Sequence, residues 1–146
     1  MSSSAAWTTP SSAAATAWSR ITSAPGITNS GFPIGEADQI EFNRWLAGNA
    51  HDRGLFIALK NAGPIAPQLV DAFDLALNEE CHAFGKCAEF QPFLEAGKPV
   101  LNVEYPADGA AARGLAADVC PRSATLGLHT LILPLALDDA FRLSCD

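Results

Sequence analysis

The sequence predicts an α/β fold in which parallel strands alternate with helices. Apolar runs of strand length recur after Gly54, and the segments between them are long enough for a helix. The starts of these runs lie 20, 25 and 28 residues apart, which is the spacing of βα units. Each run is almost continuously apolar, as expected for a parallel strand buried on both faces. The runs are residues 55–59, 75–77, 100–103 and 128–135.

Helical segments are expected before and between these runs. The first spans 36–53, with Gly35 as its cap and Gly54 as its stop signal. Its apolar side chains recur at helical spacing and predict one buried stripe. These side chains are Phe42, Trp45, Leu46 and Ala50. The remaining helices are expected over 64–73, 88–96 and 109–125, with a short one from Asp138.

The first 30 residues differ in composition and are predicted to form a disordered leader ahead of a domain spanning 31–146. Of residues 1–25, 18 are Ser, Ala or Thr, and only Arg20 is charged. Such a segment cannot bury enough apolar surface to offset the entropy of ordering it, so we expect it to make few contacts with the domain. It lacks the basic and long apolar regions of a signal peptide. No run of about 18 apolar residues predicts a membrane-spanning helix.

About four parallel strands with flanking helices are too few to close a barrel. A (β/α)8 (TIM) barrel needs eight strands and roughly 250 residues, whereas this chain has 146. Four strands would leave both edges of the sheet open and would leave uncovered the face that normally fills the barrel interior. The sequence therefore predicts a truncated (β/α)8 barrel.

The net charge argues against nucleic-acid binding. The chain carries a charge of −7, and its 9 basic residues are scattered, whereas binding to phosphates requires clustered Lys and Arg. An acidic surface would suit a cationic substrate, although acidity is commonly a matter of solubility alone. We therefore expect neither a nucleic-acid partner nor a membrane partner.

The four cysteines predict disulfides and an oxidising compartment. They are Cys81, Cys87, Cys120 and Cys145, and four cysteines allow three pairings. Their even number and their positions in loops and near the terminus favour disulfides. A metal site built from Cys81, His82 and Cys87 is the alternative, but structural zinc needs four ligands at short recurrent spacings. We therefore expect no metal, and no motif for another cofactor is present.

Polar residues follow three of the four apolar runs. They are Lys60-Asn61, Asn78-Glu79 and Glu104-Tyr105. In parallel α/β folds, ligands bind and chemistry occurs at the carboxyl ends of the strands. Glu79 therefore lies where a catalytic carboxylate would lie. The alternative is that these residues are only the polar strand ends that meet water.

Several segments together resemble glycoside hydrolase family 114, whose members are secreted TIM-barrel enzymes described as endo-α-1,4-polygalactosaminidases or α-galactosidases. The resemblance covers residues 31–146, about four-fifths of the chain. It implies the second half of the barrel, a secreted protein and a substrate that is an oligosaccharide containing galactosamine or galactose. The segments are GFPIGEADQIEFNRWLAGNAHDRGLFIALKNAG, FDLALNEECHAFGKC and PFLEAGKPVLNVEY, with the closing cysteine.

The resemblance also implies roles for individual residues. The family motif NEQC matches residues 78–81, with Glu80 in place of Gln, so Glu79 takes the role of the catalytic acid/base. The spacing of Cys81 and Cys87 matches a family disulfide, and we expect Cys120 to pair with Cys145. Substrate-binding roles fall on the other polar residues at the strand ends. These are Lys60, Asn61, Asn78, Glu104 and Tyr105.

The chain departs from the family pattern at several positions. Ala62 replaces an Asp, Pro134-Leu135 replaces a Lys-Asp pair, and no counterpart of the EPDN-type motif with the proposed nucleophile precedes Gly31. Glycosidases ordinarily need two carboxylates, about 5 to 5.5 Å apart in retaining enzymes. We therefore expect a glycosidase half-barrel that is weakly active or inactive alone. The alternatives are a degenerate half-barrel that binds carbohydrate without catalysis, and a fragment with no fold of its own.

Overall fold

The computed structural model describes the backbone of residues 17–21 and all of residues 33–146. It contains one sheet in which the strands lie side by side in the order β1-β2-β3-β4-β5-β6. The strands are β1 (Ala17–Ile21), β2 (Ile57–Asn61), β3 (Leu75–Glu79), β4 (Val100–Glu104), β5 (His129–Ile132) and β6 (Leu143–Ser144). The helices are α1 (Glu36–His51), α2 (Gln91–Glu95) and α3 (Gly109–Leu126), with the 3-10 helices η1 (Gly63–Gln68) and η2 (Cys87–Phe90).

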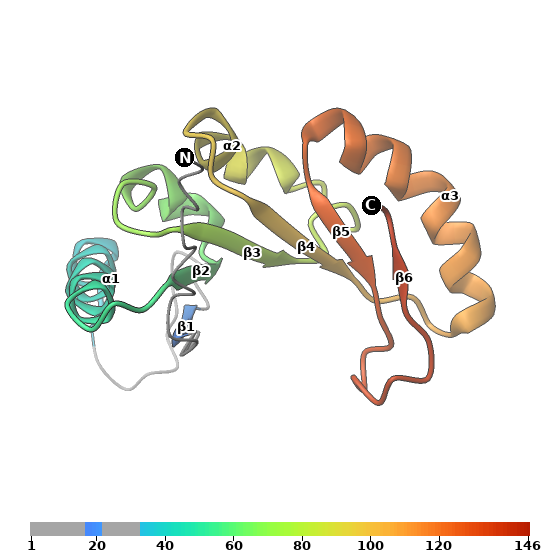
Figure 1. Ribbon diagram of the computed structural model, residues 1–146, viewed down its shortest axis with the longest axis horizontal. Coiled ribbons are helices and arrows are strands. Elements are labelled where there is room, and N and C mark those ends of the chain that lie inside the picture. Colours follow the sequence, from blue (N-terminus) through green and yellow to red (C-terminus); the bar gives the residue numbers. More distant parts are fainter. Residues whose placement is uncertain (1–16, 22–32) are drawn as a thin grey trace, which may run out of the picture.

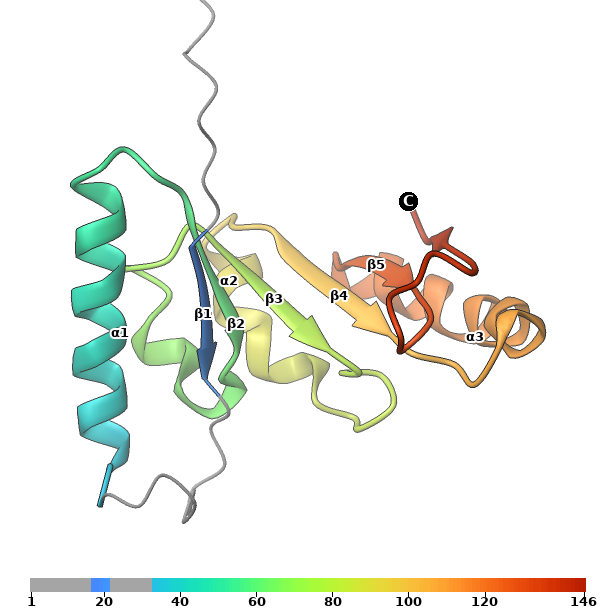
Figure 2. The same cartoon turned by 90° about the horizontal axis from the view of Figure 1, so that it is seen from below.

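The sheet is an open arch of parallel strands with helices along its outer side (Figure 1). Neighbouring strands from β1 to β5 pair in parallel, and only β6 is antiparallel to its neighbour. Seen from below, the strands fan out with a progressive twist (Figure 2), as expected for parallel pairing. The prediction of an α/β fold, part of a (β/α)8 barrel, is confirmed.

Strand β1 was not expected from the sequence, because it lies inside the Ser/Ala/Thr-rich segment. Its five residues pair along their whole length with β2, from Ala17 opposite Ile57 to Ile21 opposite Asn61. The pairing is made by the backbone, so an unpromising composition does not prevent it. The other expectations for the leader, including the boundary at residue 30, lie outside the described residues.

Helix α1 buries only part of the predicted stripe, because Ala50 and Leu46 pack into the core but the aromatic residues do not. Asn43 and Ala47 are buried together with Ala50, whereas Phe42 and Trp45 are 55% and 61% exposed. Those two rings stack on each other, with centroids 5.9 Å apart. Small residues face the sheet because they let the helix approach it closely. The predicted stripe was therefore wrong at its aromatic positions.

Two of the other expected helices are shorter than predicted. The segment expected as a helix over 64–73 forms only η1, which contains Pro64 and Pro67; proline lacks the amide hydrogen that a longer α-helix requires. The segment 88–96 is divided between η2 and α2. No helix begins at Asp138; β6 follows instead, and a disulfide between Cys120 and Cys145 joins it to α3.

The main apolar core lies between the outer face of the sheet and the helical segments. The largest fully buried side chains include Phe73, Phe93, Ile57 and Leu59. A second, smaller cluster packs α3 against β5 and is built around Ala112, Val119 and Ile132. All of these strand residues lie on the face that packs against helices. No helix among the described residues is long and apolar enough to cross a membrane.

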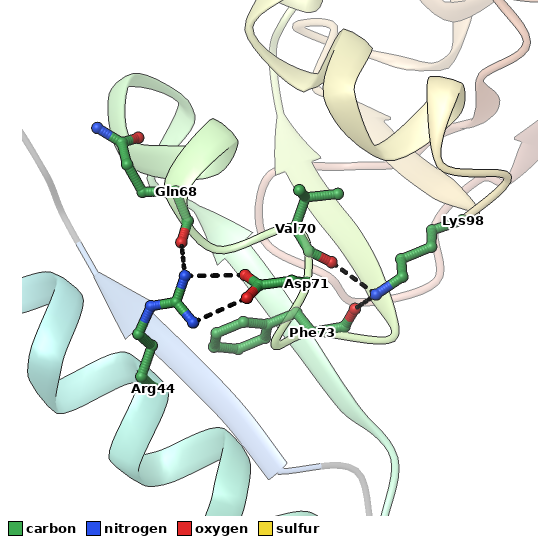
Figure 3. A network of polar contacts seen from close by, with 6 residues as sticks. All are labelled: Arg44, Gln68, Val70, Asp71, Phe73 and Lys98. Atoms are coloured by element: carbon green, nitrogen blue, oxygen red, sulfur yellow. Dashed lines mark hydrogen bonds and ion pairs between the residues drawn. The ribbon is translucent and has the colours of Figure 1, made fainter.

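The loop between η1 and β3 is held from the α1 side by an arginine (Figure 3). The Arg44 guanidinium donates to both carboxylate oxygens of Asp71, each at 2.9 Å, and to the backbone carbonyl of Gln68 at 2.6 Å. Planar, bidentate pairing of this kind fixes geometry as well as charge. The loop is therefore docked against α1 by polar contacts at the edge of the apolar core.

A lysine holds the same loop from the opposite side (Figure 3). The Lys98 ammonium, just before β4, donates to the backbone carbonyls of Val70 and Phe73, both at 2.6 Å. These contacts fix the start of β3 relative to β4. The register between these strands decides which side chains meet at their carboxyl ends.

Candidate active site

Glu79 is the last residue of β3 and faces the open, concave side of the sheet. In β3, Ala76 and Asn78 are buried, while Leu75, Leu77 and Glu79 are half-exposed. This alternation means that the buried set faces the helices. The Glu79 side chain is 25% exposed. It therefore lies at the strand end that the sequence indicated, on the face that carries no helices.

Three donors surround the Glu79 carboxylate. The Tyr105 hydroxyl donates to Oε1 at 2.9 Å, and the Lys60 ammonium lies 3.3 Å from the same oxygen. The Asn61 amide donates to Oε2 at 3.1 Å. Three neighbouring strands, β2, β3 and β4, thus bring four of the predicted site residues together.

The donors decide the charge state of this site. Burial alone would raise the pKa of Glu79, but hydrogen bonds from Asn61, Tyr105 and Lys60, together with the charge of Lys60, hold it below its usual range. Burial raises the pKa of Tyr105, and the bond to Glu79 and its charge raise it further. Glu79 is therefore ionised at neutral pH, and Tyr105 remains a neutral donor.

Backbone conformation explains how Asn61 reaches Glu79. Asn61 has φ of 57°, in the left-handed region, where asparagine is among the better tolerated residues. This conformation ends the strand alternation and turns the Asn61 amide toward β3. Its Oδ1 accepts the backbone N–H of Glu79 at 3.0 Å, while its Nδ2 donates to the Glu79 carboxylate. One side chain therefore holds both the backbone and the carboxylate of Glu79.

Asn78 and Glu104 lie on the opposite face, away from this carboxylate. They are only 2% and 1% exposed. Glu79 is paired in register with Val103, so Glu104, the next residue, points to the helix side. Asn78 and Glu104, which were both expected to bind substrate, therefore do not share the open face with Glu79. As folded, neither residue can touch a ligand bound on the open face.

Among residues 33–146, the hydrogen bonds and the ion pair of the Glu79 carboxylate all come from donor side chains. The adjacent Glu80 has φ of 58°, and its backbone N–H donates to the Val103 carbonyl at 2.7 Å. The chain therefore turns sharply after Glu79 into the disulfide loop.

Both predicted disulfides are present. Cys81 and Cys87 close the loop after β3 with Cα atoms 4.7 Å apart, and Cys120 and Cys145 are 4.9 Å apart. The sulfurs of Cys81 and Cys87 lie near His82 in an arrangement that could suggest a metal site. Because these two sulfurs are bonded to each other, neither is available as a thiolate ligand.

A cleft of about 780 Å³ adjoins Tyr105. It lies between the loop after β4 and the loop that follows β5, and includes Asp108, Pro134, Leu135 and Phe141 in its lining. Pro134 and Leu135 are two of the positions at which the sequence departs from the family pattern. The cleft thus combines apolar walls with the carboxylates of Asp108 and Asp138, and it lies next to Tyr105, which donates to Glu79.

Sequence reasoning missed a cluster of buried polar side chains beneath the site. Asn102, Ser123 and Thr130 are each no more than 1% exposed, and they lie on β4, α3 and β5. The signal available in the sequence was a polar residue within an apolar strand run, as at Asn102 and Thr130. Only the packing of α3 shows that these residues meet.

The chain matches known proteins in two comparisons. The sequence model of Glycoside-hydrolase family GH114 matches residues 17–146, beginning at the first residue of β1. The crystal structure of Aspergillus fumigatus Ega3 in complex with galactosamine superposes with a TM-score of 0.67 at 28% identity. The match covers 80% of this chain and 49% of that one, so the chain spans about half the length of its structural relative. No curated protein matches the sequence.

Proposed function

Because this chain belongs to glycoside hydrolase family GH114, we propose that its site takes an oligosaccharide containing galactosamine or galactose. The reaction would be hydrolysis of an α-glycosidic bond, with Glu79 as the catalytic carboxylate. The observation that carries the proposal is the set of three donors on Glu79, from Lys60, Asn61 and Tyr105, at the carboxyl ends of parallel strands. The Ega3 structure, solved with galactosamine, supports the choice of sugar.

Glycoside hydrolysis requires two carboxyl groups with different tasks. One protonates the leaving oxygen, and the other attacks the anomeric carbon or activates water. The family resemblance gives Glu79 the acid/base role, but a proton donor must be protonated when the substrate binds. A second carboxylate close by would raise the pKa of Glu79 toward that state, because like charges disfavour joint ionisation.

The donors around Glu79 have the opposite effect in this chain. They stabilise the ionised form, and in the described part of the chain the hydrogen bonds and the ion pair of the Glu79 carboxylate all come from donors. We therefore propose that the chain binds its sugar while hydrolysing it only weakly or not at all. The alternative function, a carbohydrate-binding half-barrel without catalysis, is favoured by the same observation and by the cleft beside Tyr105.

The experiment compares two neighbouring glutamates. Binding of α-1,4-linked galactosamine oligomers is followed by NMR titration, and hydrolysis by the release of reducing ends. Glu79→Gln should weaken binding, because it removes the negative charge from the site. Glu80→Gln, the matched control, should bind like the wild type. Hydrolysis by the wild type should be close to background.

Two results would overturn the proposal. Hydrolysis that survives Glu79→Gln would remove Glu79 from the reaction. Absence of binding to both galactosamine and galactose oligomers would remove the sugar assignment. Weak hydrolysis that depends on Glu79 would favour the enzyme over the binding module.

The disulfides bear on localisation. Cys81–Cys87 and Cys120–Cys145 account for all four cysteines, and such bonds persist in oxidising compartments. We propose that this protein belongs to a secreted lineage. Detection of both bonds by mass spectrometry in protein recovered from its natural source would test this, and free thiols there would contradict it.

A further inference from the structure

On the helix-facing side of β4 and β5, hydrogen bonds join five polar residues in a closed ring, and one of these bonds comes from a backbone N–H. The His82 backbone N–H donates to Glu104 Oε1 at 2.9 Å, and the Asn102 amide donates to the same oxygen at 3.0 Å. The Asn102 amide also approaches Thr130 at 3.3 Å, and Thr130 shares a 2.7 Å hydrogen bond with Ser123. The Ser123 hydroxyl bonds the His82 ring at 2.8 Å, which completes the ring.

The ring buries a carboxylate with no ion-pair partner among the described residues. Glu104 is 1% exposed, and its carboxylate accepts hydrogen bonds from a backbone N–H and from an amide. Burial lowers the pKa of His82 more than the Glu104 charge raises it, so the imidazole is neutral near pH 7. Well-packed apolar residues in place of a whole buried polar cluster of this kind would often be at least as stable. The carboxylate is thus poorly explained by stability alone.

The ring acts on the segment that leaves the candidate catalytic residue. His82 lies three positions after Glu79 and directly after Cys81, at the start of the disulfide loop. The Glu80 N–H donates to the Val103 carbonyl and the His82 N–H to the Glu104 carboxylate, so two backbone N–H groups hold this segment against β4. Within the loop, Lys86 N–H donates to the Cys81 carbonyl at 2.8 Å.

Glu104 also adjoins the other side of the site. Tyr105, the next residue, places its hydroxyl on the Glu79 carboxylate. The backbone of Glu104 is itself anchored, because Leu133 N–H donates to its carbonyl at 3.1 Å. The end of β4 therefore carries both Tyr105, which donates to Glu79, and Glu104, which accepts from the loop that follows Glu79.

We propose that Glu104 is a positioning residue, whose buried carboxylate clamps the His82 backbone to β4 and so holds Glu79 in reach of Tyr105. Its catalytic meaning rests on the proposed function, but the clamp itself does not. The reach of the side chain is what matters here, rather than its charge. A side chain that keeps the acceptor oxygen at the same distance should therefore preserve the clamp.

The test separates reach from charge with two variants of the full chain. Glu104→Gln keeps the length and an acceptor oxygen but loses the charge. Glu104→Asp keeps the charge but withdraws it by one methylene. Hydrogen exchange at the His82 amide is measured by NMR, with the Ala72 amide, which bonds the Leu69 carbonyl in another loop, as the internal control. Titration of Glu79 is followed through its carboxyl carbon.

Glu104→Asp should accelerate exchange at His82 by about tenfold, the scale of a lost hydrogen bond, because the acceptor oxygen is withdrawn by one methylene. It should also raise the pKa of Glu79, because Tyr105 is held less firmly. Glu104→Gln should restore protection at His82, and Ala72 should change in neither variant. Protection lost with Gln and kept with Asp would overturn the proposal, as would unchanged exchange in both.

The two proposals fail in distinguishable ways. If the proposed function is wrong, oligosaccharide binding fails in every variant and in the wild type, while exchange at His82 still depends on the length of the side chain at residue 104. If Glu104 does not position the His82 backbone, the exchange rate of the His82 amide is the same in both variants as in the wild type, even when the wild type binds sugar. Global unfolding in one variant would accelerate exchange at Ala72 as well as at His82, and the other variant would then decide.

Discussion

Removing each disulfide separately should destabilise the chain by unequal amounts. The Cys120–Cys145 bond spans a sequence separation of 25 residues, and the Cys81–Cys87 bond a separation of 6. If cross-links act by restricting the unfolded chain, these loops correspond to about 3.5 and about 2.2 kcal/mol at 25 °C. The difference, about 1.3 kcal/mol, depends only on the ratio of loop lengths. The longer loop should matter more.

The measurement is urea unfolding of two double variants in oxidising buffer. One is Cys81→Ala with Cys87→Ala, and the other is Cys120→Ala with Cys145→Ala. Cys81 is 2% exposed within the main core, so its substitution also changes packing. Repeating each measurement under reducing conditions, where both bonds are open in every chain, isolates that packing effect.

The result that would refute this reasoning is a larger loss for the Cys81–Cys87 variant after the packing correction. Equal losses would also count against it, because the loop lengths differ about fourfold. Either result would mean that the bonds act mainly on the folded state. In that case, apolar packing around Ala112, Val119 and Ile132, rather than the Cys120–Cys145 bond, would keep the C-terminal segment against α3.

Three further changes have definite expected outcomes. Tyr105→Phe removes a hydrogen bond to the ionised Glu79, so the pKa of Glu79 should rise in a carbon-detected titration; an unchanged pKa would show that Tyr105 does not hold it. Lys98→Met removes two hydrogen bonds to carbonyls of the loop before β3 and should lower the free energy of unfolding by about 1 to 3 kcal/mol in urea, a loss that Lys98→Arg should largely avoid. The pKa of Asp74 is lowered although burial raises it, because the Ile57 N–H and the His51 ring bond its carboxylate. The stabilisation of the folded chain by ionised Asp74 is therefore complete above the ordinary pKa of 3.8, and it is lost as the pH falls through the lower folded pKa. Asp74→Asn should reduce this loss of stability in acid, measured as the free energy of unfolding against pH. An identical pH profile in the variant would contradict the assignment.

Periodicity predicted the strands well because a buried parallel strand has to be apolar on both faces. The runs beginning at Leu75 and Val100 became β3 and β4 with the same first residues. Strand β1 escaped prediction because it is formed by backbone pairing with β2, which composition does not report. Periodicity also failed for α1, where Phe42 and Trp45 stack at the surface and Ala47 packs inward.

The sequence by itself determined the α/β class and the position of Glu79 at the end of its strand, whereas the cysteine pairs followed only from the family resemblance. The class and the position of Glu79 depend on order along the chain: apolar runs, spacing and the residue that follows a run. The tertiary structure alone decided that Lys60, Asn61 and Tyr105 converge on Glu79 while Glu104 turns away. The reason is physical, because the face that a residue occupies depends on register between strands and on left-handed turns such as Asn61. Neither quantity is local to the sequence, so a one-residue difference in position separates a group on the open face from one that is buried beneath it.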